Sequence, residues 1–217
     1  MKKEMIEVKI DVYMDMICPW CRMGTSSLFD ALEHHPQGKK TEVRWHAFQL
    51  NPHIRPEGED YMEVMIRKLG GPEQFAARLR QYNEYGKIYG LNFNMELVSY
   101  TPNTTLSHQL IAITPAELQK QLIDMLYTAY FEKGINIGDI EELVRIGEAV
   151  GLPNADELHL TLTQGAGLNE VQAAQSDAQR LGIKGVPFFV FNEKFSLSGL
   201  HSPDDFMKVF DRVMQEI

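Results

Sequence analysis

The chain opens with a strand, a helix and a second strand in close succession, and this unit constrains the fold more than any other feature. Residues 6–13 alternate in character as a half-buried strand does, with Val8, Ile10 and Val12 apolar. A helix is predicted over residues 19–34, followed by a second strand around Trp45. Two strands joined by a helix run parallel with a right-handed crossover, so these residues predict a βαβ unit.

Between residues 58 and 182 the strand signals disappear and helix starts and stops take their place. The run Thr-Pro-Ala-Glu at 114–117 predicts a capping box, and the helix it opens should end at Gly134. Residues 139–151 and 154–165 repeat this pattern of a polar cap, a Glu three positions on and a closing glycine. The middle of the chain is therefore predicted to be helical.

Strand character returns near the C-terminal end. Residues 186–191 and 194–197 flank the two-residue turn Asn192-Glu193, which predicts a hairpin. Ser202 then opens a final amphipathic helix. With the middle helices taken out, this order is an α/β thioredoxin-like fold. We expect that domain in residues 1–58 and 169–217, with an inserted all-helical domain in residues 59–168.

The chain has two cysteines, Cys18 and Cys21, in the run Cys-Pro-Trp-Cys. Pro19 suits the first helical position, which makes Cys18 the predicted N-cap, where free backbone N–H groups and the helix dipole stabilise a thiolate. Cys21 lies on the same helical edge and can close a disulfide with Cys18. Cys18 is thus the predicted nucleophile and Cys21 the resolving thiol. Arg22 could add positive charge near the thiols, but an arginine at this position is more often exposed, and exposure is expected.

Zinc binding and chance are the alternatives to a redox role for the cysteine pair. A zinc site needs two further ligands, and the chain has no other cysteine and no histidines at ligand spacing near the motif, so no metal is expected. A chance pair is disfavoured by its place between a predicted strand and a helix start. Two cysteines also exclude a disulfide-stapled secreted scaffold.

Pro187 stands at the start of the aromatic strand, where a proline removes a ladder donor. It is either a plain strand start or part of a cis Val186–Pro187 bond. A cis bond would hold the Val186 backbone in an exposed turn, beside which an extended substrate could pair.

Charge and hydropathy exclude other classes. The net charge of −9 argues against nucleic acid as a partner. No segment approaches the roughly 18 consecutive apolar residues of a membrane span. The first residues carry charges where a secretory signal needs an apolar core, so a cytoplasmic location is expected.

Four segments of the chain carry a likeness to a known family, namely residues 15–21 with Gly24, 48–52, Asn103-Thr104 with Ser107-His108, and 182–189 with Ser198-Gly199. In these segments the chain resembles the DsbA-like thioredoxin-fold oxidoreductases, most closely their FrnE-type branch. The resemblance implies that Pro187 is a cis-proline facing the cysteines and that His108 faces the cleft from an inserted helix, although an ordinary helix-surface histidine remains an alternative. Ser107 and Phe188 depart mildly from the family pattern.

Substrate binding is accordingly predicted at Pro19, Trp20, Val186, Pro187 and His108. The predicted function is dithiol–disulfide exchange or isomerisation on protein or small thiol substrates, in the oxidising or the reducing direction. No cofactor is expected beyond the redox-active pair, with glutathione a candidate redox partner and a homodimer a candidate assembly. One alternative is a glutathione-dependent transferase or isomerase of the kappa or hydroxychromene-carboxylate type. Such enzymes resemble this chain but use Ser where Cys18 stands. The other alternative is a non-catalytic binding module.

Overall fold

The computed structural model describes residues 8–36 and 38–216, and within them four strands form one mixed sheet in the order β2-β1-β5-β6. Strand β1 (Val8–Met14) pairs in parallel with β2 (Thr41–Ala47), and helix α1 (Pro19–His34) joins them. This confirms the predicted βαβ unit, although residues 6 and 7 of its first strand lie outside the described residues. Strand β5 (Phe188–Phe191) runs antiparallel to β1, and β6 (Phe195–Ser198) forms the edge.

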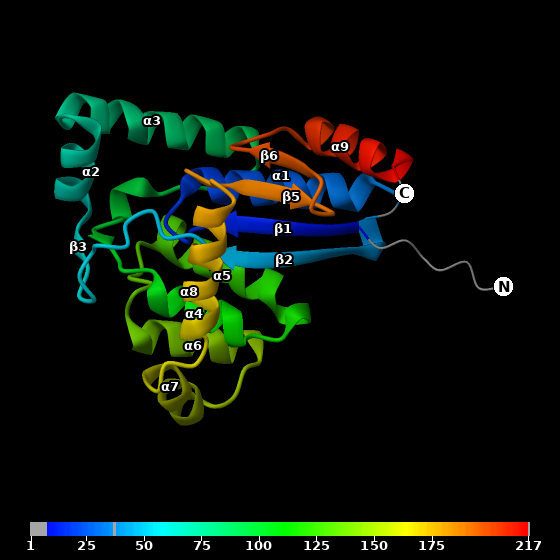
Figure 1. Cartoon of the computed structure of the whole chain (residues 1–217). Helices are drawn as coiled ribbons and strands as arrows, with labels where there is room; N and C mark the ends of the chain where they lie inside the picture. The colour runs from blue at the N-terminus through cyan, green and yellow to red at the C-terminus, as the bar shows by residue number, and fades with distance from the viewer. Residues whose placement is uncertain (1–7, 37, 217) are drawn as a thin grey trace.

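Helices cover both faces of the sheet (Figure 1). Helices α1 and α9 (Pro203–Gln215) lie together on one side of it, and α8 (Leu168–Arg180) crosses the other side. The helices from α4 (Thr105–Ile113) to α7 (Ala155–Thr163) gather beyond β2. No helix in the described ranges is long and apolar enough to cross a membrane. The helices after α1 are α2 (Tyr61–Leu69), α3 (Pro72–Ile88), α4 (Thr105–Ile113), α5 (Ala116–Lys133), α6 (Ile140–Val150), α7 (Ala155–Thr163), α8 (Leu168–Arg180) and α9 (Pro203–Gln215).

The inserted region is mainly helical, which confirms the predicted thioredoxin-like fold with a helical insertion, and one short strand pair corrects the detail that it is all-helical. Strands β3 (Glu59–Asp60) and β4 (Tyr100–Thr101) pair antiparallel within it. A two-residue strand is too short to show the alternation by which strands are recognised in a sequence. The predicted domain boundaries stay a prediction. Helices α4 and α8 lie on either side of the second boundary and both contact β2, so these contacts do not separate the two predicted domains.

The capping box expected at residues 114–117 is also wrong. The Thr114 hydroxyl donates to the Leu110 carbonyl at 2.6 Å, so it serves the end of α4 and not the start of α5. Helix α5 begins at Ala116 after an extended Pro115 with no side-chain cap. Threonine hydroxyls bond readily to a carbonyl one turn back, and that local bond prevails here.

Other predicted starts and turns are confirmed. The Asp139 side chain accepts N–H groups at the start of α6, and Gly151 ends that helix in a left-handed conformation. Asn192 and Glu193 have φ angles of 46° and 58°, the backbone of a tight two-residue hairpin turn. Ser202 and Asp205 form the expected capping box of α9.

The sheet carries a charge cluster that should make stability depend on pH. The Asp11 carboxylate on β1 accepts from Arg44 at 2.7 Å and contacts the His46 ring nitrogen at 2.6 Å. Burial alone would raise the pKa of Asp11, but the hydrogen bonds and charges of His46 and Arg44 outweigh it and lower that pKa. A depressed native pKa stabilises the fold above the unfolded-state pKa, and the contribution is lost as pH falls through the native value.

We therefore expect Asp11→Asn to lower the free energy of unfolding by about 1 kcal/mol near neutral pH, and by progressively less below about pH 4. Urea unfolding of both proteins at neutral and acid pH measures this. Asp124→Asn is a matched control, because Asp124 forms an exposed ion pair with Lys120. An equal difference between wild type and Asp11→Asn at both pH values would contradict the prediction.

Candidate active site

The two cysteines lie at the start of α1, as their spacing predicts. Cys18 is the N-cap residue, with φ −97° and ψ 107°, and Pro19 takes the first helical position. The Cys18 Sγ accepts the backbone N–H of Cys21 at 3.2 Å. A thiolate at Cys18 would therefore face one of the free donors of the helix start and the positive end of the helix dipole.

Both thiols are buried, and their surroundings differ by a cavity. Cys21 is 0 % exposed and Cys18 is 2 % exposed, and of the two only Cys18 lines the cavity of about 210 Å³. Burial raises the pKa of the Cys21 thiol well above its ordinary value, and the neighbouring Cys18 raises it further. A thiol with a raised pKa stays protonated at neutral pH, so Cys21 is expected in its thiol form.

The proline before β5, from the C-terminal part of the chain, lies next to the cysteine pair. The Val186–Pro187 bond is cis, and the Val186 carbonyl accepts from the Cys18 Sγ at 3.6 Å. Gly24 permits this approach, since a Cβ there would lie 2.9 Å from the Pro187 ring. A side chain at Gly24 would push α1 away from the proline.

The cavity beside Cys18 is largely apolar, and the described residues that line it include two cations and no carboxylate. Lys68 and Arg78 come from α2 and α3, while Trp20 packs edge-on against Tyr82 with ring centroids 5.5 Å apart. Among the residues predicted to bind substrate, three line this cavity, namely Pro19, Trp20 and Val186.

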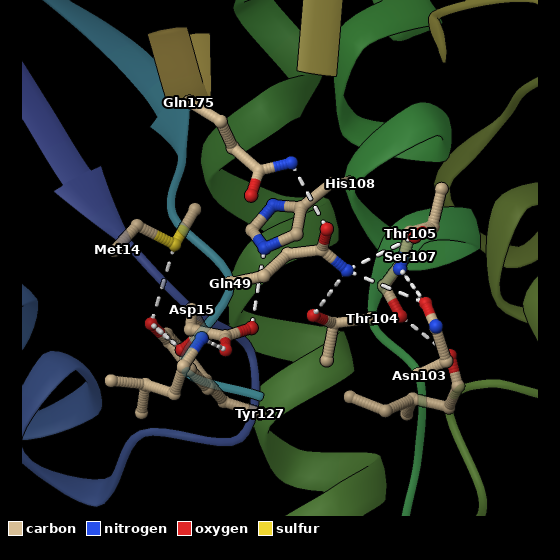
Figure 2. Close-up of polar contacts among 12 residues, drawn as sticks. Met14, Asp15, Gln49, Asn103, Thr104, Thr105, Ser107, His108, Tyr127 and Gln175 are labelled. Atoms are coloured by element: carbon tan, nitrogen blue, oxygen red, sulfur yellow. Dashed lines mark hydrogen bonds and ion pairs between the residues drawn. The ribbon is translucent and has the colours of Figure 1, made fainter. Parts of the chain in front are cut away.

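The buried carboxylate of Asp15 lies just before the motif (Figure 2). Its Oδ1 lies 3.2 Å from His108 Nε2, and its Oδ2 accepts the Leu50 N–H at 2.7 Å. The Asp15 carbonyl accepts the Cys18 N–H at 3.1 Å. The sequence prediction included Asp15 only in the family likeness and assigned it no role, although an acid directly after an apolar strand was a usable signal.

His108 faces Asp15 and lines a different cavity from that of Cys18. The cavity of about 360 Å³ lies between β1, β2, α4, α5 and α8, and none of the described residues that line it also lines the Cys18 cavity. The predicted substrate contact of His108 stays a prediction. Its alternative as a helix-surface residue is wrong, since its side chain is buried.

Arg22 is buried, which corrects the expectation that it is exposed. Its guanidinium forms an ion pair with Glu132 of α5, donates to the Tyr127 carbonyl and lies 5.2 Å from the centre of the Phe93 ring. The charge of Arg22 thus joins α1 to the inserted helices.

No cluster within residues 8–36 and 38–216 brings together three or more His, Cys, Asp or Glu side chains that could hold a metal ion. In that part of the chain, the cysteine pair therefore lacks the further ligands that tetrahedral zinc requires.

The cysteine pair lies at a helix start, and the residue before the cis-proline contacts Cys18. Together with the mixed four-stranded sheet, this arrangement defines a thioredoxin-fold dithiol protein. The chain belongs to the family of the DSBA-like thioredoxin domain, whose profile matches residues 9–211. This confirms the resemblance to DsbA-like proteins, while the FrnE-type branch stays a prediction.

Three individual proteins are similar to this chain over most of its length. The uncharacterized protein YwbO of Bacillus subtilis (strain 168) is 26% identical over 188 residues, spanning 86% of this chain and 88% of that protein. A probable DsbA oxidoreductase from Streptomyces coelicolor is 25% identical with a TM-score of 0.89, over 97% of this chain and 91% of that one. The cytosolic disulfide reductase DsbM of Pseudomonas aeruginosa, solved with GSH, is 16% identical with a TM-score of 0.64, over 95% and 99%, and shows likeness of fold alone.

Proposed function

We propose that this protein is a thiol–disulfide oxidoreductase acting on protein or small thiol substrates through Cys18 and Cys21. The observation that carries the proposal is the division between the thiols. Cys18 caps α1 and lines a cavity, whereas Cys21 is fully covered and does not line that cavity.

The reducing direction proceeds in two exchanges. The Cys18 thiolate attacks a substrate disulfide, so that a Cys18–substrate bond forms and the first substrate thiolate leaves. Cys21 loses its proton and attacks the Cys18 Sγ, which forms the Cys18–Cys21 disulfide and releases the second substrate thiolate. Two equivalents of an external thiol then restore the dithiol. The reverse sequence oxidises a substrate dithiol.

The backbone beside Pro187 supports binding of an extended substrate. Because the Val186 carbonyl lies against Cys18, a peptide running past the cis-proline would bring its own sulfur to the nucleophile. Backbone contacts of this kind would bind protein disulfides largely independently of the side chains of the substrate peptide.

The cations of the cavity support small thiols that carry carboxylates. Among the described residues of the lining, Lys68 and Arg78 stand without a neighbouring acid, in a chain whose net charge is −9. DsbM was solved with GSH. Glutathione, with two carboxylates, is thus a candidate redox partner here.

We expect the double substitution Lys68→Met with Arg78→Met to raise the KM for glutathione disulfide about tenfold, since a loss of about 1.4 kcal/mol corresponds to that factor. The kcat/KM for uncharged hydroxyethyl disulfide should stay unchanged. Steady-state kinetics with both disulfides measures the difference, with exposed Lys194→Met as the control. Equal losses for both substrates would contradict a role in carboxylate recognition.

The lining of the same cavity also favours a second candidate function, that of a glutathione-dependent transferase or isomerase. Its aromatic wall of Tyr61 and Tyr82 beside the two cations would suit an aromatic substrate bound together with glutathione. That chemistry needs no resolving thiol, so its turnover would survive Cys21→Ala.

Insulin reduction by dithiothreitol tests the proposed function. The protein should accelerate the reaction well above dithiothreitol alone. Absence of acceleration, together with cysteines that do not react with mild disulfide reagents, would leave a non-catalytic binding module.

A further inference from the structure

Thr101 on β4 carries a buried hydroxyl that the fold does not use. Its side chain is 2 % exposed, and its Oγ1 has no hydrogen-bond partner within residues 8–36 and 38–216. A buried polar atom without a partner costs free energy, and most such atoms in folded proteins have one. A hydroxyl that costs stability and makes no bond in the fold is placed to bind a ligand.

The Thr101 side chain belongs to the cavity beside Cys18. Thr101 lines that cavity of about 210 Å³ together with Cys18 and Val186. Neighbouring side chains of a strand point to opposite sides. Tyr100, the other residue of β4, is 49 % exposed, so the Thr101 side chain points inward. Pairing of Thr101 with Glu59 of β3 fixes this direction.

The two cations of the cavity are nearer to solvent than Thr101. Lys68 is exposed and Arg78 is half-buried. The hydroxyl of Tyr130, which also lines the cavity, donates to the Tyr100 carbonyl at 2.9 Å and so has its partner. Thr101 therefore offers a polar contact in the covered part of the cavity, and the cations offer charge in its more open part.

A hydroxyl and a cation recognise different chemical groups. Lysine and arginine bind carboxylates, whereas a threonine hydroxyl can donate to a carbonyl oxygen and accept from an N–H. A peptide amide presents both of these groups. In a short peptide that contains cysteine, an amide lies between the sulfur-bearing residue and the terminal carboxylate. Such a ligand carries all three groups for which the cavity has partners.

We propose that the Thr101 hydroxyl hydrogen-bonds the amide of a short peptide thiol whose sulfur is at Cys18 and whose carboxylate is at the two cations. The proposal rests on the proposed function and narrows its small-thiol substrates to those of peptide type. Thr101 is then a binding residue that selects substrates by their amide, and it takes no part in the exchange of thiols.

Three variants separate substrate binding from a role in the fold. Thr101→Val keeps the shape of the side chain and removes the hydroxyl, and Thr101→Ser keeps the hydroxyl. Thr114→Val is the matched control, because Thr114 is also buried but its hydroxyl donates to the Leu110 carbonyl at 2.6 Å. Thr114 does not line the Cys18 cavity.

The experiment compares the reduction of three disulfides by steady-state kinetics. Glutathione disulfide carries amides and carboxylates, dithiodipropionate carries carboxylates without amides, and hydroxyethyl disulfide carries neither. Thr101→Val should lower the ratio of kcat/KM for glutathione disulfide to that for dithiodipropionate about tenfold, as expected for one lost hydrogen bond. Thr101→Ser and Thr114→Val should keep the wild-type ratio. The ratio of dithiodipropionate to hydroxyethyl disulfide should be the same in all four proteins.

Urea unfolding gives an independent readout. Thr101→Val should leave the urea midpoint unchanged or raise it, because the substitution breaks no hydrogen bond of the protein and removes an unpaired polar atom. Thr114→Val should lower the midpoint, because it leaves the Leu110 carbonyl without the threonine donor.

The outcomes distinguish this proposal from the proposed function. An unchanged substrate ratio in Thr101→Val, or a urea midpoint that falls as it does in Thr114→Val, would overturn the role of Thr101 and leave the oxidoreductase intact. Wild-type protein that reduces insulin but none of the three small disulfides would also overturn this proposal alone. Wild-type protein that reduces neither insulin nor the small disulfides would overturn the proposed function.

Discussion

Cys18→Ala should lower disulfide exchange by about a thousandfold or more, because it removes the nucleophile itself. Cys21→Ala should behave differently. Cys18 is unchanged in this variant, so the first attack should proceed at nearly the wild-type rate. The reaction should then stop at the mixed disulfide, because the variant lacks the Cys21 thiol that would attack the Cys18 Sγ and release the substrate.

Mass spectrometry of the Cys21→Ala protein after exposure to glutathione disulfide detects this adduct as one bound glutathione. The paired measurement is insulin reduction by both variants, with Ser196→Ala as a control on the exposed edge strand. Full activity of Cys18→Ala would refute the assignment of the nucleophile. Efficient turnover by Cys21→Ala would favour the glutathione-dependent alternative.

The second large effect is expected at Arg22. Arg22→Met should lower the free energy of unfolding by about 2–3 kcal/mol, because it leaves Glu132 without its cation in a partly buried site. The stacking of the guanidinium near Phe93 is lost as well. Urea denaturation measures the change.

A double-mutant cycle with Glu132→Gln isolates the pair. The double variant should be less destabilised than the sum of the single variants, because the uncompensated charge is gone. Arg145→Met is a matched control, since its ion pair with Glu142 on α6 has an exposed arginine and should contribute well under 1 kcal/mol. Strict additivity of Arg22→Met and Glu132→Gln would show that the ion pair itself contributes nothing.

Short-range patterns alone determined most of the elements of this protein. The βαβ unit, the start of α1 at Cys18 and the hairpin turn at Asn192-Glu193 depend on residues a few positions apart. Backbone propensity, proline position and capping chemistry act at that range, so they are visible in a linear sequence. The same reasoning identified the cysteine pair, whose chemistry depends on its spacing.

The surroundings of the cysteines were decided by the tertiary structure. Asp15 meets His108, 93 positions along the chain, and Arg22 meets Glu132, 110 positions along. Each of these contacts depends on how α4 and α5 pack against β1 and α1, and no local pattern encodes that packing. The different surroundings of the two buried thiols have the same origin, since Cys18 lines a cavity that Cys21 does not line. Spacing placed Cys18 and Cys21 at the start of one helix, and only long-range packing buried Cys21 completely.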